Sequence, residues 1–156
     1  MCEKESFMRE AIKLSLDNID HDGGPFGAVI VKDGKIIARG VNRVTASVDP
    51  TAHAEVNAIR EAARVLGTFD LSGCEIYTSC EPCPMCLGAI YWAHLDKVYY
   101  GNTKADAKEI GFDVSFIYDE LDLPLAKRHW NVVRMMRVEA IRAFETWENR
   151  SDKREY

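Results

Sequence analysis

Hydrophobic side chains at helical spacing open the chain, and shorter apolar runs follow. Residues 5–18 carry apolar side chains at every third or fourth position, which predicts an amphipathic helix. Gly23-Gly24-Pro25 then interrupts the pattern. Residues 27–31 and 36–41 predict two strands, and Asp33-Gly34 between them is typical of a tight hairpin turn. The chain therefore begins with one helix and an antiparallel pair of strands.

A second helix is expected to begin at Asp49-Pro50, because a capping carboxylate followed by proline is typical of a first helical turn. Gly67 is placed to end it. Residues 74–78 predict a short strand. Residues 84–93 predict a third helix, which is so apolar that we expect it to be buried nearly all round. The predicted buried stripe of the second helix consists of Ala52, Val56, Ile59, Ala63 and Leu66.

The remaining chain continues the alternation of strands and helices. Residues 98–100 predict a strand, residues 105–110 a helix, and residues 115–121 a short helix or turn. Residues 132–138 predict a last strand and residues 140–148 a last helix. This order indicates a layered α/β domain. Because the connection between the last two strands contains a helix, we expect these strands to be parallel.

Two short motifs carry groups that bind metals, His53-Ala54-Glu55 and Pro82-Cys83-Pro84-Met85-Cys86. The imidazole of His53 and the thiols of Cys83 and Cys86 give three protein ligands. A catalytic zinc has this number, whereas a structural zinc usually has four. Zinc lowers the pKa of a water in the open position towards neutrality. Glu55 is a carboxylate beside the ligands that can carry protons, so we expect Zn²⁺ chemistry with Glu55 as the catalytic residue.

The predicted elements place both motifs at the N-terminal ends of helices. Residues two apart on a helix point about 200° away from each other, so His53 and Glu55 serve one site only if the metal lies off the helix end. The positive end of the third helix favours the thiolates of Cys83 and Cys86. We therefore expect zinc between two helix ends. The backbone N–H groups of Ala54 and Cys83 are candidates to orient the water.

A closed structural site is the alternative, because Cys80 lies three residues before Cys83 and would complete a Cys₃His set. Two features count against it. Pro82 and Pro84 stiffen the run, which makes it hard to wrap three of its thiols around one ion. A structural site would also leave Glu55 without a role. The catalytic interpretation is therefore favoured.

Length and composition limit the kind of protein and its partners. A chain of 156 residues is long enough to bury a core, and we expect a single domain over residues 1–156. Acidic residues outnumber basic ones by 25 to 20, for a net charge of −5. No nucleic-acid partner is expected, because proteins that grip nucleic acids normally carry a basic surface.

The length of the apolar runs and the spacing of the cysteines indicate the cellular compartment. No apolar run approaches the roughly 18 residues of a membrane span, so no membrane partner is expected, and the charged N-terminus is unlike a signal peptide. Three of the five cysteines are clustered at ligand spacing, which fits a reducing cytoplasm better than a disulfide framework. We therefore expect a cytoplasmic protein.

Three blocks of sequence, residues 23–31, 49–56 and 77–93, carry a resemblance to a known family. They contain H-x-E followed by P-C-x-x-C, the signature of the zinc nucleobase deaminases. The chain resembles the cytidine deaminase-like superfamily and, within it, the small bacterial zinc-dependent guanine deaminases. The likeness to the guanine branch depends on residues 112–113 and 115–118 and on the closing Glu155-Tyr156. The resemblance implies a three-layer α/β/α sandwich with a mixed sheet of about five strands.

The same resemblance implies a reaction and partners. It implies hydrolytic deamination of a free purine base, with guanine converted to xanthine and ammonia, by a homodimeric Zn²⁺ enzyme. A small nucleobase as substrate agrees with the acidic charge. Guanine deaminases that end in a similar way exchange their C-terminal segment to close the pocket. Residues 149–156 are therefore expected to be exchanged between subunits, with Tyr156 at the substrate, although a solvated tail is the alternative.

The resemblance also implies which residues contact the substrate, because residues of this chain occupy the positions of the family's contact residues. Asn42 corresponds to an asparagine that hydrogen-bonds the base, although asparagine is also common in turns. Phe26 corresponds to a ring that stacks on the substrate, with core packing as its alternative. Trp92 lies where the family has an aromatic residue near the pocket, but a buried helix favours a core role. Guanine deaminases of this type tend to have two aspartates after Gly-Phe. This chain has Asp113-Val114, so either Asp113 takes the role of the second aspartate through a shift of the loop, or that role is absent.

Two other functions would also account for part of the zinc motif. A tRNA adenosine deaminase, or another nucleoside or cytosine deaminase, uses the same zinc motif but needs a basic approach surface, and here Lys and Arg are scattered. A zinc-stabilised binding module without catalysis would need the ligands but not Glu55. A free-base deaminase fits both the charge and the motifs.

Overall fold

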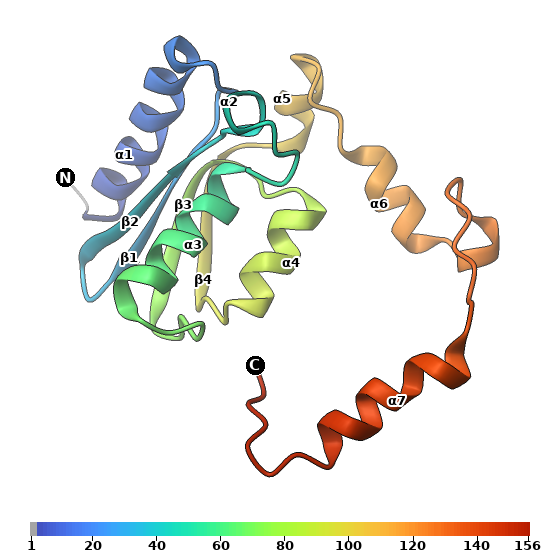
Figure 1. Ribbon diagram of the computed structural model, residues 1–156. Helices are drawn as coiled ribbons and strands as arrows, with labels where there is room; N and C mark the ends of the chain where they lie inside the picture. Colours follow the sequence, from blue (N-terminus) through green and yellow to red (C-terminus); the bar gives the residue numbers. More distant parts are fainter. Residues whose placement is uncertain (1–2) are drawn as a thin grey trace. The chain divides into compact units, whose positions relative to one another are not determined.

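A four-stranded mixed sheet forms the centre of the first part of the chain (Figure 1). β1 is antiparallel to both β2 and β3, whereas β3 and β4 are parallel. The last two strands of this sheet, β3 and β4, are parallel as expected, although the predicted last strand at residues 132–138 is not part of the sheet. The strands, in the spatial order β2-β1-β3-β4, are β1 (Gly27–Lys32), β2 (Lys35–Val41), β3 (Cys74–Cys80) and β4 (Lys97–Asn102).

The computed structural model describes residues 3–156, which divide into two units after Ser115. Helices cover both faces of the sheet in the first unit (Figure 1). Val29 and Val31 of β1 face α1, while Ala28 and Ile30 join the core formed with the helices on the opposite face. The three-layer α/β/α architecture is thus confirmed. The covering helices are α1 (Glu3–Asp17) on one face, and α3 (Ala54–Leu66) and α4 (Pro84–Trp92) on the other.

α3 begins at Ala54, with His53 as its N-cap residue, and the predicted start at Asp49-Pro50 is wrong. The Asp49 carboxylate accepts hydrogen bonds from the backbone N–H and the hydroxyl of Thr51, at 2.8 and 2.7 Å. It therefore closes a local turn instead of capping a helix. The later start leaves His53 at the helix end.

The buried face of α3 also differs from the predicted stripe. A Cβ atom at Gly40 of β2 would fall 2.5 Å from the amide nitrogen of Ala58, so only small side chains fit between helix and strand. This close approach fixes the start of α3 against the sheet. The buried residues of the helix in the main core are Ala54, Ala58 and Ala62. The members of the predicted stripe that pack beside them, only partly buried, are Ile59, Ala63 and Leu66.

α4 is less buried than the sequence predicts. Cys86 and Ile90 are buried, but Tyr91 and Trp92 are 73% and 65% exposed. The core and α3 lie against one side of the helix and leave the other side open within the described residues. The prediction of burial nearly all round is therefore wrong in this structure.

Shorter helices complete the first unit. The predicted helix after β4 is confirmed, and Thr103 and Asp106 close a capping box at its start. The shorter helices are the 3₁₀ helix η1 (Asn18–His21), α2 (Val44–Ser47) and α5 (Lys104–Glu109).

Residues 116–156 form the second unit, which contains no strand. The prediction of a strand at residues 132–138 is wrong, and the sheet has four strands instead of about five. A strand needs a hydrogen-bonded neighbour, and this unit offers none. No residue of the unit is buried. Across residues 3–156, every helix is too short or too polar to cross a membrane. The helical segments of this part are α6 (Ser115–Asp122), η2 (Leu125–Lys127) and α7 (Arg137–Glu148).

Candidate active site

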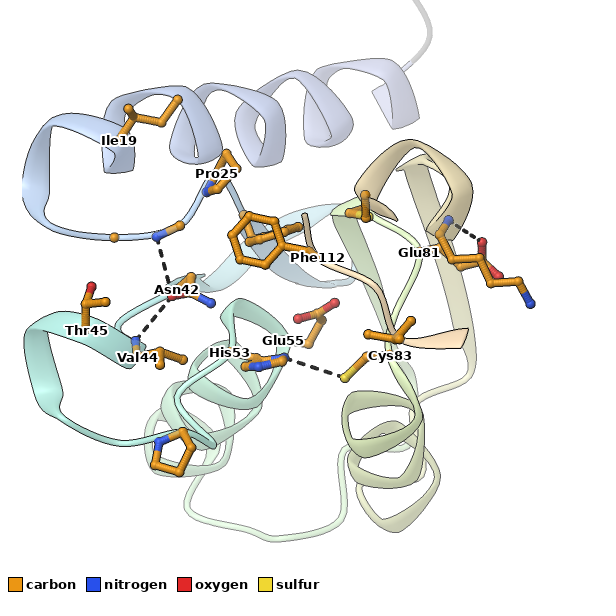
Figure 2. A pocket seen from close by; sticks show the side chains of 18 of the residues that line it. Ile19, Pro25, Asn42, Val44, Thr45, His53, Glu55, Glu81, Cys83 and Phe112 are labelled. Atoms are coloured by element: carbon orange, nitrogen blue, oxygen red, sulfur yellow. Dashed lines mark hydrogen bonds between the residues drawn. The ribbon is translucent and has the colours of Figure 1, made fainter. Parts of the chain in front are cut away.

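The side chains of His53, Cys83 and Cys86 converge on one point, and Figure 2 shows the first two facing each other. Nδ1 of His53 lies 3.5 Å from Sγ of Cys83 and 3.4 Å from Sγ of Cys86. Zinc bonds of about 2.0 Å to nitrogen and 2.3 Å to sulfur, at a tetrahedral angle, separate such atoms by about 3.5 Å. The spacing therefore fits Zn²⁺ held through Nδ1 of His53.

Cys80 does not belong to this group. Its Sγ donates to the carbonyl oxygen of Thr103 at 3.8 Å. Within residues 3–156, the metal-binding group consists of the one histidine and two cysteines described above. The fourth position of a tetrahedral ion is thus not taken by Cys80, so the geometry favours an open site over a closed Cys₃His site.

Two helix starts position the ligands. His53 and Cys83 are the N-cap residues of α3 and α4, both with extended backbone, and Pro84 occupies the first turn of α4. Proline fits there because the N–H that it lacks has no acceptor inside the helix. The positive ends of both helices favour negative charge on the thiolates. The prediction that both ligand groups lie at helix N-termini is confirmed.

Hydrogen bonds among the ligands set their ionisation. Hydrogen bonds from Cys86 and from His53 lower the pKa of Cys83 to about 4, so this thiol is ionised at neutral pH. The hydrogen bond to Cys83 raises the pKa of His53. The hydrogen bond between Cys86 and Cys83 raises the pKa of Cys86, because it stabilises the protonated thiol, and burial and repulsion by the negative charges of Glu55 and Cys83 add to this. A divalent cation bound to both sulfurs would relieve this repulsion.

Glu55 lies in the first turn of α3, beside the ligands, and is 6% exposed. Its Oε1 accepts a hydrogen bond from the hydroxyl of Thr78 at 3.3 Å, and its Oε2 accepts one from Sγ of Cys86 at 3.4 Å. Burial raises the pKa of Glu55. A buried carboxyl group with a raised pKa is suited to take up and release a proton.

These groups open into a cavity of about 610 Å³ (Figure 2), a size typical of small-molecule sites. His53, Glu55 and Cys83 provide its chemically reactive surface. Loops supply most of the remaining wall, and much of that wall is apolar. The apolar wall consists of Ile19, Pro25, Phe26, Val44, Pro50, Ala107, Phe112 and Val114.

Asn42 lines the cavity directly after β2 and is 7% exposed. Its Oδ1 accepts hydrogen bonds from the backbone N–H groups of Gly24 and Val44, at 3.4 and 3.2 Å (Figure 2). These bonds fix the amide plane and leave Nδ2 to donate to an occupant of the cavity. Asn42 therefore holds its own turn and still offers a donor, so its two predicted roles are compatible.

Phe26 and Phe112 form an aromatic corner in the cavity. Their ring centroids are 4.9 Å apart and their planes are at 90°, an edge-to-face contact. The sequence pointed to Phe26 through its family position. It gave Phe112 no contact role, and the only signal for Phe112 was its place in a block typical of the guanine branch.

Charged residues at the cavity were also missed. Asp22, Glu81 and Lys104 line it, and the Glu81 carboxylate accepts a hydrogen bond from the backbone N–H of Lys104 at 2.9 Å. Asp22 and Lys104 lie in separate loops with no motif spacing. Only Glu81, inside the cysteine block, carried a sequence signal.

The other predicted contact residues are placed as follows. Ala54 is the first residue of α3, beside His53, and its N–H is one of the amides that have no acceptor inside the helix. Trp92 is the last residue of α4, about 12 Å along the axis from its start, and does not line the cavity. Asp113 does not line it either, whereas Val114 does. Tyr156 belongs to the second unit and is 75% exposed.

An α/β/α sandwich with an open His-Cys-Cys metal group beside a buried carboxylate has the features of a zinc-dependent hydrolase. The zinc-binding region of the cytidine and deoxycytidylate deaminases matches residues 1–102. The chain belongs to this deaminase family.

Three relatives are similar over most of the chain. The guanine deaminase of Bacillus subtilis is 53% identical over 153 residues, which cover 97% of this chain and 98% of that protein, and its X-ray structure matches with a TM-score of 0.94. The structure of a guanine deaminase from Nitrosomonas europaea is 39% identical, with a TM-score of 0.68, and covers 70% of this chain and 64% of that one. A tRNA-specific adenosine deaminase of Aquifex aeolicus is 40% identical over 121 residues, 78% of each chain.

Proposed function

We propose that this protein is a Zn²⁺-dependent guanine deaminase that converts guanine and water into xanthine and ammonia. The observation that carries the proposal is the 53% identity with the Bacillus subtilis guanine deaminase, which extends over nearly the whole of both chains. The cavity supports it, because an apolar wall with few polar groups suits an uncharged aromatic base.

His53, Cys83 and Cys86 hold the metal in this proposal, and their spacing supports it. When bound, zinc supplies a water of lowered pKa as the nucleophile. The backbone N–H of Ala54, at the start of α3, points to the same end of the helix as His53 and is proposed to orient the reacting oxygen.

Glu55 carries the protons that deamination must move. Attack of water on C2 of guanine forms a C–O bond, takes a proton from the water and places one on a ring nitrogen. Loss of ammonia breaks the C2–N2 bond and requires a proton on the leaving amine. One buried carboxyl group beside the ligands can accept and return these protons without exchange with bulk water.

Three further side chains are proposed to hold the base. Nδ2 of Asn42 would donate to an acceptor on its edge. Phe26, with the ring of Phe112 packed against it, would contact the face or rim of the base. Asp113 and Trp92 take no part in this proposal, because neither lines the cavity.

We also propose that the protein acts as a homodimer in which residues 149–156 are exchanged and Tyr156 closes the partner's cavity. The second unit has no buried residue, although it carries Phe144 and Trp147, which are 73% and 44% exposed. Apolar surface of this kind is normally covered by another surface. The cluster of free cysteines at ligand spacing favours a reducing compartment, so we propose a cytoplasmic location.

Deamination of tRNA adenosine is the second candidate, because the Aquifex aeolicus relative acts on tRNA by its name. The net charge of −5 disfavours a polyanionic substrate. Ammonia release from guanine, adenine, cytosine and their nucleosides, measured beside inosine formation in a tRNA anticodon stem-loop, separates these functions. We expect guanine to be the preferred substrate. Inosine formation without ammonia from guanine would replace this proposal with the second candidate.

A further inference from the structure

Thr78 places a hydroxyl on a face of β3 that is otherwise apolar. Alternate residues of this strand face α3 and α4, and Cys74 and Ile76 on that face belong to the main core. Thr78 is 1% exposed and pairs with Ala28 of β1. Burial of a hydroxyl is unfavourable unless it forms a hydrogen bond. The partner of Thr78 therefore indicates its role.

That partner is Glu55. Oγ1 of Thr78 donates to Oε1 of Glu55 at 3.3 Å, and both side chains are buried. The other carboxylate oxygen, Oε2, accepts from Sγ of Cys86. A cysteine that holds zinc is a thiolate and has no proton to donate. When zinc is bound, Cys86 can no longer donate, and Thr78 is the one of these two residues that still donates a hydrogen bond to the Glu55 carboxylate.

We propose that Thr78 is a positioning residue, which fixes the Glu55 carboxylate in the orientation that proton transfer needs. The carboxylate ends a flexible side chain whose backbone belongs to α3. Thr78 belongs to β3, an inner strand that pairs with neighbours on both sides. The hydrogen bond thus ties the proton carrier to the sheet, and proton transfer depends closely on such geometry.

The kinetic test of this inference rests on the proposed deaminase function. Thr78→Val removes the hydroxyl and keeps the shape, while Thr78→Ser keeps the hydroxyl. Because a hydrogen bond to a charged group is being removed, we expect Thr78→Val to lower kcat by about 10- to 100-fold. KM should change by less than about threefold, because Thr78 does not line the cavity. Thr78→Ser should restore most of kcat.

Ser79→Ala is the matched control. The Ser79 hydroxyl is also buried, on the same strand, but it accepts a hydrogen bond from the backbone N–H of Gly27 at 3.1 Å and does not contact Glu55. We expect this variant to keep kcat, even if its thermal stability decreases. Zinc content is measured for every variant and should remain at the wild-type value.

A readout independent of turnover is the orientation of Glu55 in crystal structures of the zinc-bound wild type and Thr78→Val. We expect the carboxylate to turn away from its wild-type position in the variant. If Thr78→Val does not fold, Thr78→Ala gives the same comparison. Unchanged kcat together with an unchanged Glu55 orientation would overturn the inference. If the wild type releases no ammonia from guanine, the proposed substrate fails, and the orientation of Glu55 still decides the role of Thr78.

Discussion

The Asp113 carboxylate forms an ion pair with Lys108, whose Nζ lies 3.1 Å from Oδ2. It also accepts hydrogen bonds from the backbone N–H and the hydroxyl of Ser115, at 2.8 and 2.6 Å. Chiefly the Ser115 bonds, with Lys108, lower the pKa of Asp113 to about 2. The next residue, Val114, lines the cavity instead. In this structure Asp113 is engaged in the loop before α6 and supplies no carboxylate at the position of Val114.

We expect Asp113→Ala to change kcat/KM for guanine by less than about twofold, as is usual for a surface position. It should lower the melting temperature at pH 7. The folded-state pKa of about 2 lies below the ordinary value, so the contribution of Asp113 to stability is present above about pH 4 and is lost as the pH falls towards 2. Melting curves at pH 7 and near pH 2 check this, with Lys108→Ala as a control that removes the ion pair but keeps the hydrogen bonds from Ser115 to Asp113. A tenfold loss of kcat/KM would place Asp113 at the substrate.

The zinc content of cysteine variants should distinguish the proposed ligands, Cys83 and Cys86, from Cys80. We expect one zinc per chain in the wild type and in Cys80→Ser, and loss of zinc in Cys83→Ser and Cys86→Ser, because only the latter two sulfurs lie near His53 Nδ1. Metal analysis of the purified variants measures this. Equal zinc loss in Cys80→Ser and Cys83→Ser would support a closed four-ligand site.

Glu55→Gln should keep the fold and the zinc but lose turnover, because an amide cannot accept the proton. General acid–base catalysis contributes about 10²- to 10⁴-fold, so kcat should fall by at least that range. The measurement is steady-state ammonia release at matched zinc content. Near-normal kcat in this variant would remove Glu55 from the mechanism.

Deletion of residues 152–156 should leave zinc content and thermal stability nearly unchanged and sharply lower kcat/KM, if the tail closes a cavity and excludes water. Tyr156→Phe is the matched control for the ring, and Tyr156→Ala removes it. Unaltered kinetics in the truncated protein would indicate that the segment is a solvated tail and does not close the cavity.

A mixed dimer tests whether this closure occurs between subunits. One subunit carries Glu55→Gln with an intact tail, and the other carries an intact Glu55 without residues 152–156. Neither homodimer should be active at the wild-type level. Exchange of the tail predicts that mixing restores activity at the site of the truncated subunit. Absence of any gain after subunit exchange, verified by mass, would argue against a tail that acts in the partner.

The metal centre could be predicted because its information is local. His53, Cys83 and Cys86 have fixed spacing within two motifs, and each motif meets a helix start that favours negative charge. The sandwich was predictable for a similar reason, since strand alternation and helical periodicity depend on short stretches.

The errors came from a competing local turn and from features that depend on tertiary contacts. Asp49 has the chemistry of a helix cap, but its carboxylate bonds to Thr51 instead. Residues 132–138 have strand-forming side chains but no strand beside them in their unit. Phe112 reaches the cavity through a loop whose path has no periodicity, so its place beside Phe26 is seen only in the structure.

Gly40 connects the packing of the sheet with the chemistry of the site. A Cβ atom there would meet the amide nitrogen of Ala58 at 2.5 Å and the carbonyl oxygen of Ala54 more closely still. α3 would have to move away from β2 to make room. Ala54 lies between His53 and Glu55, so the same movement would draw one ligand and the proton carrier away from the cysteines of α4, which a different helix holds. One methyl group, added at a residue that does not line the cavity, would thus move two parts of the catalytic centre out of alignment.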